Sequence, residues 1–245
     1  MNEPPAPSPV RALAGAAAIV LLLYLLGSAS FIVRVVEAPL VWLATFAHET
    51  GHGLAAMLVG ARFERLVIFW DASGVATHSG VAADSAARAI VSAGGLLGPA
   101  FLAAAFFALG TRPRLARVGL ALFGAFMLAI AALFVRNVFG LVFTVGCGAL
   151  FLLGARKLGP ERAQIAMLFV AIQLALSVFS RADYLFTSVA RTGAGEMPSD
   201  VANVAAALGG PFWLWGLIIG GWSVLVLVGG LGVVWWSSGR ATPLR

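Results

Sequence analysis

Charged residues are scarce in this chain of 245 residues. Asp, Glu, Lys and Arg together make up 11% of it, whereas soluble domains carry about a quarter. Hydrophobic residues make up 61%, and the mean hydropathy is +0.98. This composition argues against a soluble domain and indicates an integral, multi-pass membrane protein. At roughly 20 residues for each transmembrane helix, the length allows about six or seven spans.

Cysteine is also nearly absent, because Cys147 is the single one. A disulfide within the chain is therefore excluded, and a metal site built from cysteines is unsupported. The net charge of +6 would raise nucleic acid as a partner in a soluble protein. Here the basic residues are few and lie between apolar runs, where membrane proteins place them towards the cytoplasm and anionic lipid. We expect the lipid bilayer as a partner and no nucleic acid, and the Ala/Gly/Val/Arg-rich composition indicates a bacterial cell membrane.

The order of apolar runs predicts one transmembrane domain over residues 10–238, between a proline-rich, disordered tail at 1–9 and a C-terminal tail at 239–245. The first span is expected from about Val10 to Val33, and a second helix from Pro39, which suits a first turn, to about Val59. The later spans are expected near residues 86–109, 115–135, 138–154, 163–189 and 212–236, with a short helix at 201–208.

Residues 62–79 have a different character from the spans. The run RLVIFW is branched and aromatic, DASG is typical of a turn, and VATHS follows. This pattern predicts a β-hairpin, and because an open sheet edge cannot face lipid, the hairpin must lie at the membrane surface or against the helices. The predicted fold class is an all-α polytopic membrane protein of six or seven transmembrane helices, with a small β-hairpin after the second helix.

The second helix carries an H-E-x-x-H motif, His48-Glu49-Thr50-Gly51-His52. Positions i and i+4 share one face of a helix, so both imidazoles can reach the same metal ion. Glu49 would take a proton from a zinc-bound water, whose pKa zinc lowers to about 7, and pass it to the leaving amine. Ionisable groups in a span cost about 2.5–3.5 kcal/mol each on insertion scales and are usually functional. The alternative is a chance match or a structural cluster.

The motif and its surroundings resemble the site-2 protease family. HETGH is followed by a hairpin that ends in THSG and then by AGGLLGPAFLAAAF. The family consists of polytopic zinc metalloproteases that cleave substrates within the membrane, and the similarity is closest to its compact branch without a PDZ domain. The resemblance covers much of the chain. It implies that His48 and His52 bind Zn²⁺ and that Glu49 is the catalytic acid/base.

The resemblance also implies a third ligand, an aspartate on a later span, usually followed by glycine and preceded by an Asn/Pro motif. This chain departs from that pattern. Asp183, in SRADYLF, is preferred because it adjoins a span, although it could equally be an interfacial carboxylate near Arg181. Asp200, in PSDVANVAA, is the alternative; because it follows Ser199 and opens a helix, the helix dipole alone explains an acidic residue there.

Two further polar residues have simple interpretations. Asn137 is expected to cap a helix, and His78 to be an exposed hairpin residue, although it could lie near the site. The leading functional prediction is an intramembrane zinc metalloprotease that acts on a membrane-spanning protein or peptide. The alternative is a non-proteolytic membrane protein with a regulatory or structural metal site, or a metal carrier. Glu49 favours the protease, since a cluster of ligands needs no general base.

Overall fold

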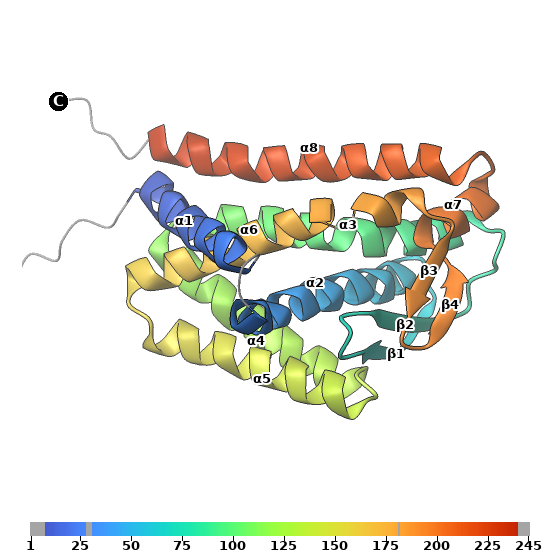
Figure 1. Cartoon of the computed structure of the whole chain (residues 1–245), viewed down its shortest axis with the longest axis horizontal. Helices are drawn as coiled ribbons and strands as arrows, with labels where there is room; N and C mark the ends of the chain where they lie inside the picture. The colour runs from blue at the N-terminus through green and yellow to red at the C-terminus, as the bar shows by residue number, and fades with distance from the viewer. Residues whose placement is uncertain (1–7, 28–30, 181, 240–245) are drawn as a thin grey trace, which may run out of the picture.

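A computed structural model describes residues 8–27, 31–180 and 182–239 of the chain (Figure 1). The predicted tails therefore lie largely outside the described residues. In chain order the elements are α1 (Pro9–Gly27), α2 (Phe31–Leu58), β1 (Arg62–Ile68), β2 (Gly74–Ser79), α3 (Ala86–Leu109), α4 (Pro113–Leu133), α5 (Val138–Lys157), α6 (Pro160–Ser180), the 3₁₀ helix η1 (Ala182–Phe186), β3 (Val189–Thr192), β4 (Gly195–Pro198), α7 (Asp200–Leu208) and α8 (Phe212–Gly239).

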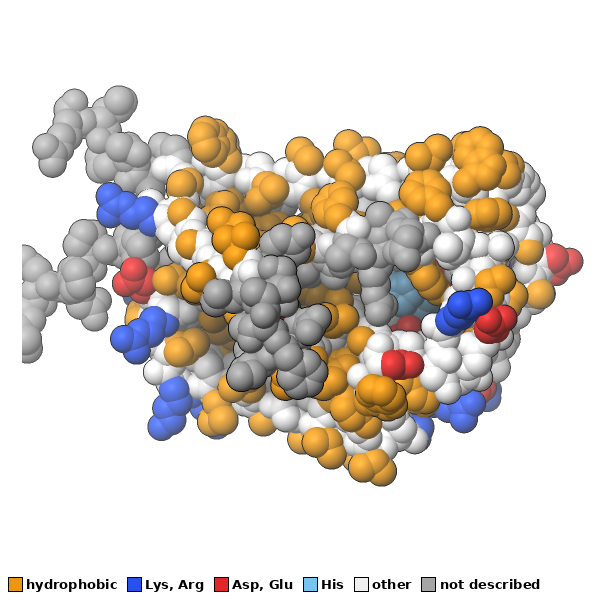
Figure 2. Space-filling model, in the orientation of Figure 1, with side chains coloured by type: hydrophobic (Ala, Val, Ile, Leu, Met, Phe, Trp, Pro, Cys, Tyr) orange, Lys and Arg blue, Asp and Glu red, His pale blue; other side chains and the backbone are white. Residues whose placement is uncertain are grey.

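The long helices run along the long axis of the molecule, and the strands and α7 gather at one end of it (Figure 1). Among the described residues, five helical stretches are long and apolar enough to cross a membrane: α3, α4, α5, α6 continued through η1, and α8. A shorter apolar helix, Pro9–Leu23, lies within α1. Apolar side chains are spread over the described part of the visible face, and charged side chains lie mainly towards its two ends (Figure 2). The predicted fold class is confirmed.

The first two helices divide at a different place from the one predicted. Helix α2 is continuous from Phe31 to Leu58 and contains Pro39, which was expected to begin a helix. The first helix ends at Gly27, before the expected end at Val33. A proline inside a helix removes one hydrogen bond and crowds the preceding turn, but Pro39 is exposed, so its ring displaces no packed neighbour.

The predicted hairpin is present, with β1 and β2 antiparallel and a register irregularity between Phe63 and Arg65. Phe63, Leu66 and Ile68 of β1 are buried in the main core. The outer edge of β1 is bonded to the segment between α4 and α5. The Leu66 N–H donates to the Phe134 carbonyl at 2.8 Å, and the Leu66 carbonyl accepts from the Arg136 N–H at 3.0 Å.

Asn137 extends this edge with its side chain. It stands at the N-cap position of α5, but its side chain makes no capping hydrogen bond. Its Nδ2 donates to the Ile68 carbonyl at 2.7 Å, and its Oδ1 accepts from the Ile68 N–H at 3.3 Å. The amide therefore takes the place of a further strand residue beside β1. Asn137 has the predicted cap position at the start of α5, but its side chain bonds to β1 and not to the helix.

A second hairpin, formed by β3 and β4, was not predicted. Span six is expected from the sequence to reach about residue 189, whereas α6 ends at Ser180 and η1 follows. The new hairpin lies on the turn of the first one. The Gly193 N–H donates to Ser73 Oγ at 2.8 Å, and a Cβ at Gly193 would come within 2.6 Å of the Phe69 ring. Four-residue strands give too short a pattern to detect in a sequence.

We expect Asn137→Ala to lower the thermal unfolding midpoint of the detergent-solubilised protein. The substitution leaves the N–H and carbonyl of Ile68 without their side-chain partner, and such unpaired groups cost about 1–3 kcal/mol each when buried. Thermal unfolding followed by intrinsic fluorescence would measure the shift. A midpoint equal to that of the wild type would show that this edge contact adds nothing to stability.

Candidate metal centre

The H-E-x-x-H motif lies on an unbroken part of α2, as predicted. His48 and His52 share one face, with their ring centroids 4.8 Å apart and their Nε2 atoms 3.2 Å apart. The two side chains are 19% and 12% exposed. Both imidazoles therefore direct their Nε2 atoms to the same point.

Glycines let α3 pack directly against this part of α2. A Cβ at Gly51 would lie 2.3 Å from the Gly94 carbonyl oxygen, and a Cβ at Gly98 would lie 2.7 Å from the Ala47 carbonyl oxygen. A Cβ at Gly95 would lie 2.2 Å from the His52 ring. Close helix contacts of this kind are typical of small residues in membrane bundles, and here they occur beside the motif.

This packing fixes the orientation of the His52 ring. Its Nδ1 lies 2.8 Å from the Val91 carbonyl oxygen on α3. Because a carbonyl can only accept, Nδ1 carries the hydrogen, and in the neutral ring the lone pair is then on Nε2. A backbone carbonyl that accepts from the second ring nitrogen is the usual support of a histidine that binds metal.

Asp200 brings a carboxylate to the two imidazoles from a distant part of the chain. Its Oδ2 lies 3.1 Å from His48 Nε2, and its Oδ1 lies 3.3 Å from His52 Nε2. Asp200 is the first residue of α7, whose N-cap, Ser199, accepts from the Ala202 N–H at 3.2 Å. Helix α7 is held by a small apolar core that is made of Ala89, Val201, Val204 and Ile219.

The three side chains fit a metal ion. The candidate ligand atoms of His48, His52 and Asp200 all lie within 4.8 Å of one another. Burial disfavours the ionised form of Asp200, but the adjacent imidazoles outweigh this effect and hold the pKa of the carboxyl below its usual range. Two imidazoles and a carboxylate direct their lone pairs to one point here. These lone pairs repel each other unless a cation or a proton lies between them. The donor set is therefore suited to a divalent cation.

Of the other residues that the sequence singled out, Asp71 and His78 are described and do not belong to this cluster. Asp183 belongs to η1, and its side chain is not among those described. Asp71 accepts from the N–H and the hydroxyl of Ser73, at 2.9 and 2.7 Å, in the turn of the first hairpin. His78 is partly buried, and its Nε2 lies 3.4 Å from Arg88 Nη1. Burial and the Arg88 charge lower the pKa of His78.

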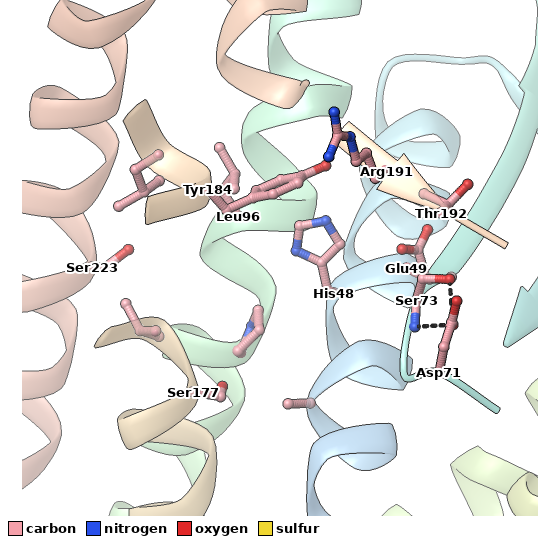
Figure 3. A pocket seen from close by; sticks show the side chains of 15 residues that line it. His48, Glu49, Asp71, Ser73, Leu96, Ser177, Tyr184, Arg191, Thr192 and Ser223 are labelled. Atoms are coloured by element: carbon pink, nitrogen blue, oxygen red, sulfur yellow. Dashed lines mark hydrogen bonds between the residues drawn. The ribbon is translucent and has the colours of Figure 1, made fainter. Parts of the chain in front are cut away.

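Glu49 points towards a cavity from beneath the first hairpin. Glu49 is only 6% exposed. A Cβ at Gly74 would lie 2.6 Å from Glu49 Cγ, and the Ala76 backbone N–H donates to the carboxylate. The cavity has a volume of about 320 Å³, and Figure 3 shows His48 and Glu49 in its wall. The residues that line it are Ala44, His48, Glu49, Asp71, Ser73, Gly74, Leu96, Pro99, Ser177, Val178, Tyr184, Leu185, Arg191, Thr192 and Ser223.

Among the described residues, the apolar helices that can span a membrane, together with a histidine pair and a carboxylate that could bind one metal ion, define a membrane protein with a candidate metal site. Residues 13–230 match a family model described as Peptidase M50B-like, and the chain belongs to that family. This confirms the resemblance to the site-2 proteases that the sequence indicated. Comparison with curated proteins and with solved structures gave no match.

We expect Gly95→Ala to weaken metal binding. The new methyl group would lie 2.2 Å from the His52 ring, so the ring must turn away from Asp200. Loss of ligand orientation costs about 10–100-fold in metal affinity. Competition with a chromogenic chelator in detergent would measure the change.

Gly146→Ala is a matched control for this prediction. A Cβ at Gly146, on α5, meets no atom within 4 Å, so the same substitution there should leave metal affinity unchanged. Wild-type affinity in Gly95→Ala would show that the close contact does not set the position of His52.

Proposed function

We propose that this protein is an intramembrane zinc metalloprotease, which hydrolyses a peptide bond of a membrane-embedded protein or peptide. The observation that carries the proposal is the position of Glu49. In the sequence of α2 it lies between His48 and His52, whose Nε2 atoms face the Asp200 carboxylate. Glu49 also lines the same 320 Å³ cavity as His48. A general base beside a metal site that opens on a cavity is the arrangement that metal-assisted hydrolysis requires.

His48, His52 and Asp200 are the ligands that we propose for zinc. Two imidazoles and one carboxylate with a position left open are typical of catalytic zinc sites. Bound there, zinc would polarise a carbonyl and lower the pKa of a water to about 7. We prefer Asp200 to Asp183 as the third ligand because the Asp200 carboxylate lies within 3.3 Å of both imidazoles. Its place at a helix start is compatible with that role.

Glu49 is proposed as the general acid/base. The Ala76 backbone is a hydrogen-bond partner of its carboxylate, which places the carboxylate beside β2. The water oxygen adds to the scissile carbonyl carbon, and Glu49 takes one water proton. Glu49 then delivers that proton to the amine nitrogen as the C–N bond breaks.

The first hairpin is proposed to hold the unwound substrate. The outer edge of β1 is already bonded at Leu66 and Ile68, so a substrate strand would add to β2, at positions other than the Ala76 N–H, which meets Glu49. Strand β2 begins at Gly74, against Glu49. A peptide added to this edge by backbone hydrogen bonds would pass beside the general base. In a helical substrate every backbone carbonyl is hydrogen-bonded within the helix. Pairing with β2 would hold the substrate in an extended form, in which the scissile carbonyl is accessible.

We expect Glu49→Gln to retain metal and lose cleavage. Glutamine keeps the size of the side chain but cannot accept the proton, and loss of a general base costs on the order of 10²–10⁴ in rate. Purified wild type and variant would be compared for metal content and for cleavage of a panel of transmembrane peptides. Equal cleavage by both proteins would contradict the role of Glu49. Absence of a bound metal in both would contradict the protease.

We expect Asp200→Ala, but not Asp183→Ala, to remove the metal. Deleting a ligand should cost more than the roughly 10–100-fold that a lost supporting contact costs. Each variant would be dialysed against a zinc buffer and its metal content measured by mass spectrometry. The two aspartates serve as controls for each other, since the substitution is identical. Metal loss confined to Asp183→Ala would reverse the assignment.

A further inference from the structure

The cavity beside Glu49 contains several hydrogen-bond donors that a peptide carbonyl could meet. They are the side chains of Ser73, Ser177, Tyr184, Arg191, Thr192 and Ser223. Four of these hydroxyl groups donate to groups that lie close to them in the sequence. Ser177 and Ser223 donate to carbonyls of their own helices at 2.7 and 3.0 Å. Ser73 donates to the carboxylate two residues before it at 2.7 Å, and Thr192 to a carbonyl of its own hairpin at 3.1 Å.

Tyr184 meets the candidate metal centre through the ring of His48. Its ring meets the His48 ring edge-on, with centroids 6.0 Å apart and an interplanar angle of 83°. Figure 3 shows Tyr184 extending from η1 across the cavity, with its hydroxyl end towards β3, while Glu49 points in from α2 on the other side of His48. The scissile bond of a substrate in this cavity would lie between the two side chains.

The position of Tyr184 is fixed by the packing of η1 on α8. A Cβ at Gly216 would lie 2.0 Å from the Leu185 carbonyl oxygen, so the backbone next to Tyr184 contacts the α8 backbone directly. Leu185 also packs against the small core that holds α7. The phenol is thus placed by the same elements that position Asp200.

We propose that Tyr184 is a further catalytic residue, whose hydroxyl donates a hydrogen bond to the scissile carbonyl oxygen as that atom gains negative charge. This inference rests on the proposed protease function. A phenol O–H is a hydrogen-bond donor. A positioned donor that meets the charge only in the transition state lowers the barrier without tightening substrate binding.

The proton balance distinguishes the roles of the two side chains. Glu49 carries one proton from water to the amine nitrogen. Tyr184 keeps its own proton throughout, since it donates a hydrogen bond and no proton. Removing the hydroxyl should therefore reduce the rate of the chemical step and leave the ground-state complex intact.

The test compares Tyr184→Phe with Tyr24→Phe. The chain has two tyrosines, so Tyr24→Phe makes the same chemical change on α1, none of whose described residues lines the cavity. For a transmembrane peptide we expect Tyr184→Phe to lower kcat by about 100-fold, with KM and metal content unchanged, and Tyr24→Phe to match the wild type. A second measurement needs no turnover: the affinity for a peptide phosphinate, which mimics the tetrahedral state, should fall by a similar factor.

Several outcomes would overturn the inference. Wild-type kcat and phosphinate affinity in Tyr184→Phe would remove the role of the hydroxyl, and loss of metal would show that the residue only supports His48. A larger fall in kcat and phosphinate affinity in Arg191→Gln than in Tyr184→Phe would assign the donor to Arg191. If the wild type binds metal but cleaves nothing, the proposed function fails, and phosphinate affinity still decides whether Tyr184 stabilises a tetrahedral oxyanion.

Discussion

The close contact between α2 and α3 is the constraint on which the candidate metal centre depends. Gly51, Gly94 and Gly95 let the two backbones touch, and only at that distance can the Val91 carbonyl accept from His52 Nδ1 at 2.8 Å. In a bilayer, helices associate through packing and hydrogen bonds because lipid tails are as apolar as their side chains. The glycines therefore do two things at once, since they hold the helices together and set the direction of a candidate ligand.

The polar end of the molecule is held together by hydrogen bonds between elements that are far apart in the sequence. Thr45 on α2 donates to the Ala72 carbonyl at 2.6 Å, and Ser73 accepts from the Gly193 N–H at 2.8 Å. Ser199 in turn donates to the Thr187 carbonyl at 2.6 Å. These contacts connect α2, both hairpins and the start of α7. Their effect is to fix Asp200 relative to the histidines, although about 150 residues separate them in the chain.

What the sequence could predict follows from how local each signal is. The histidine pair was readable because i and i+4 fall on one face of any helix, and the first hairpin because its strands and turn are adjacent. The second hairpin and the end of α6 were missed, since short strands have little pattern. The α1–α2 boundary was misplaced because Pro39 is tolerated at an exposed position inside a helix. The sequence favours Asp183 as the third ligand because it adjoins a span. The closeness of Asp200 to the histidines depends on how Val201 and Val204 pack, and no local pattern in the sequence reveals that packing.

The feature that made Asp200 resemble an ordinary helix-start residue also suits it to bind a cation. An acidic residue in the first turn of a helix is stabilised as the anion by the helix dipole and by free backbone N–H groups. Asp200 is 7% exposed, and such burial alone would favour the neutral acid. The imidazoles lower its pKa, and the start of α7 acts in the same direction. A carboxylate that is kept ionised in a buried place is the form that a metal ion requires, so the structural and the functional interpretations of Asp200 support each other.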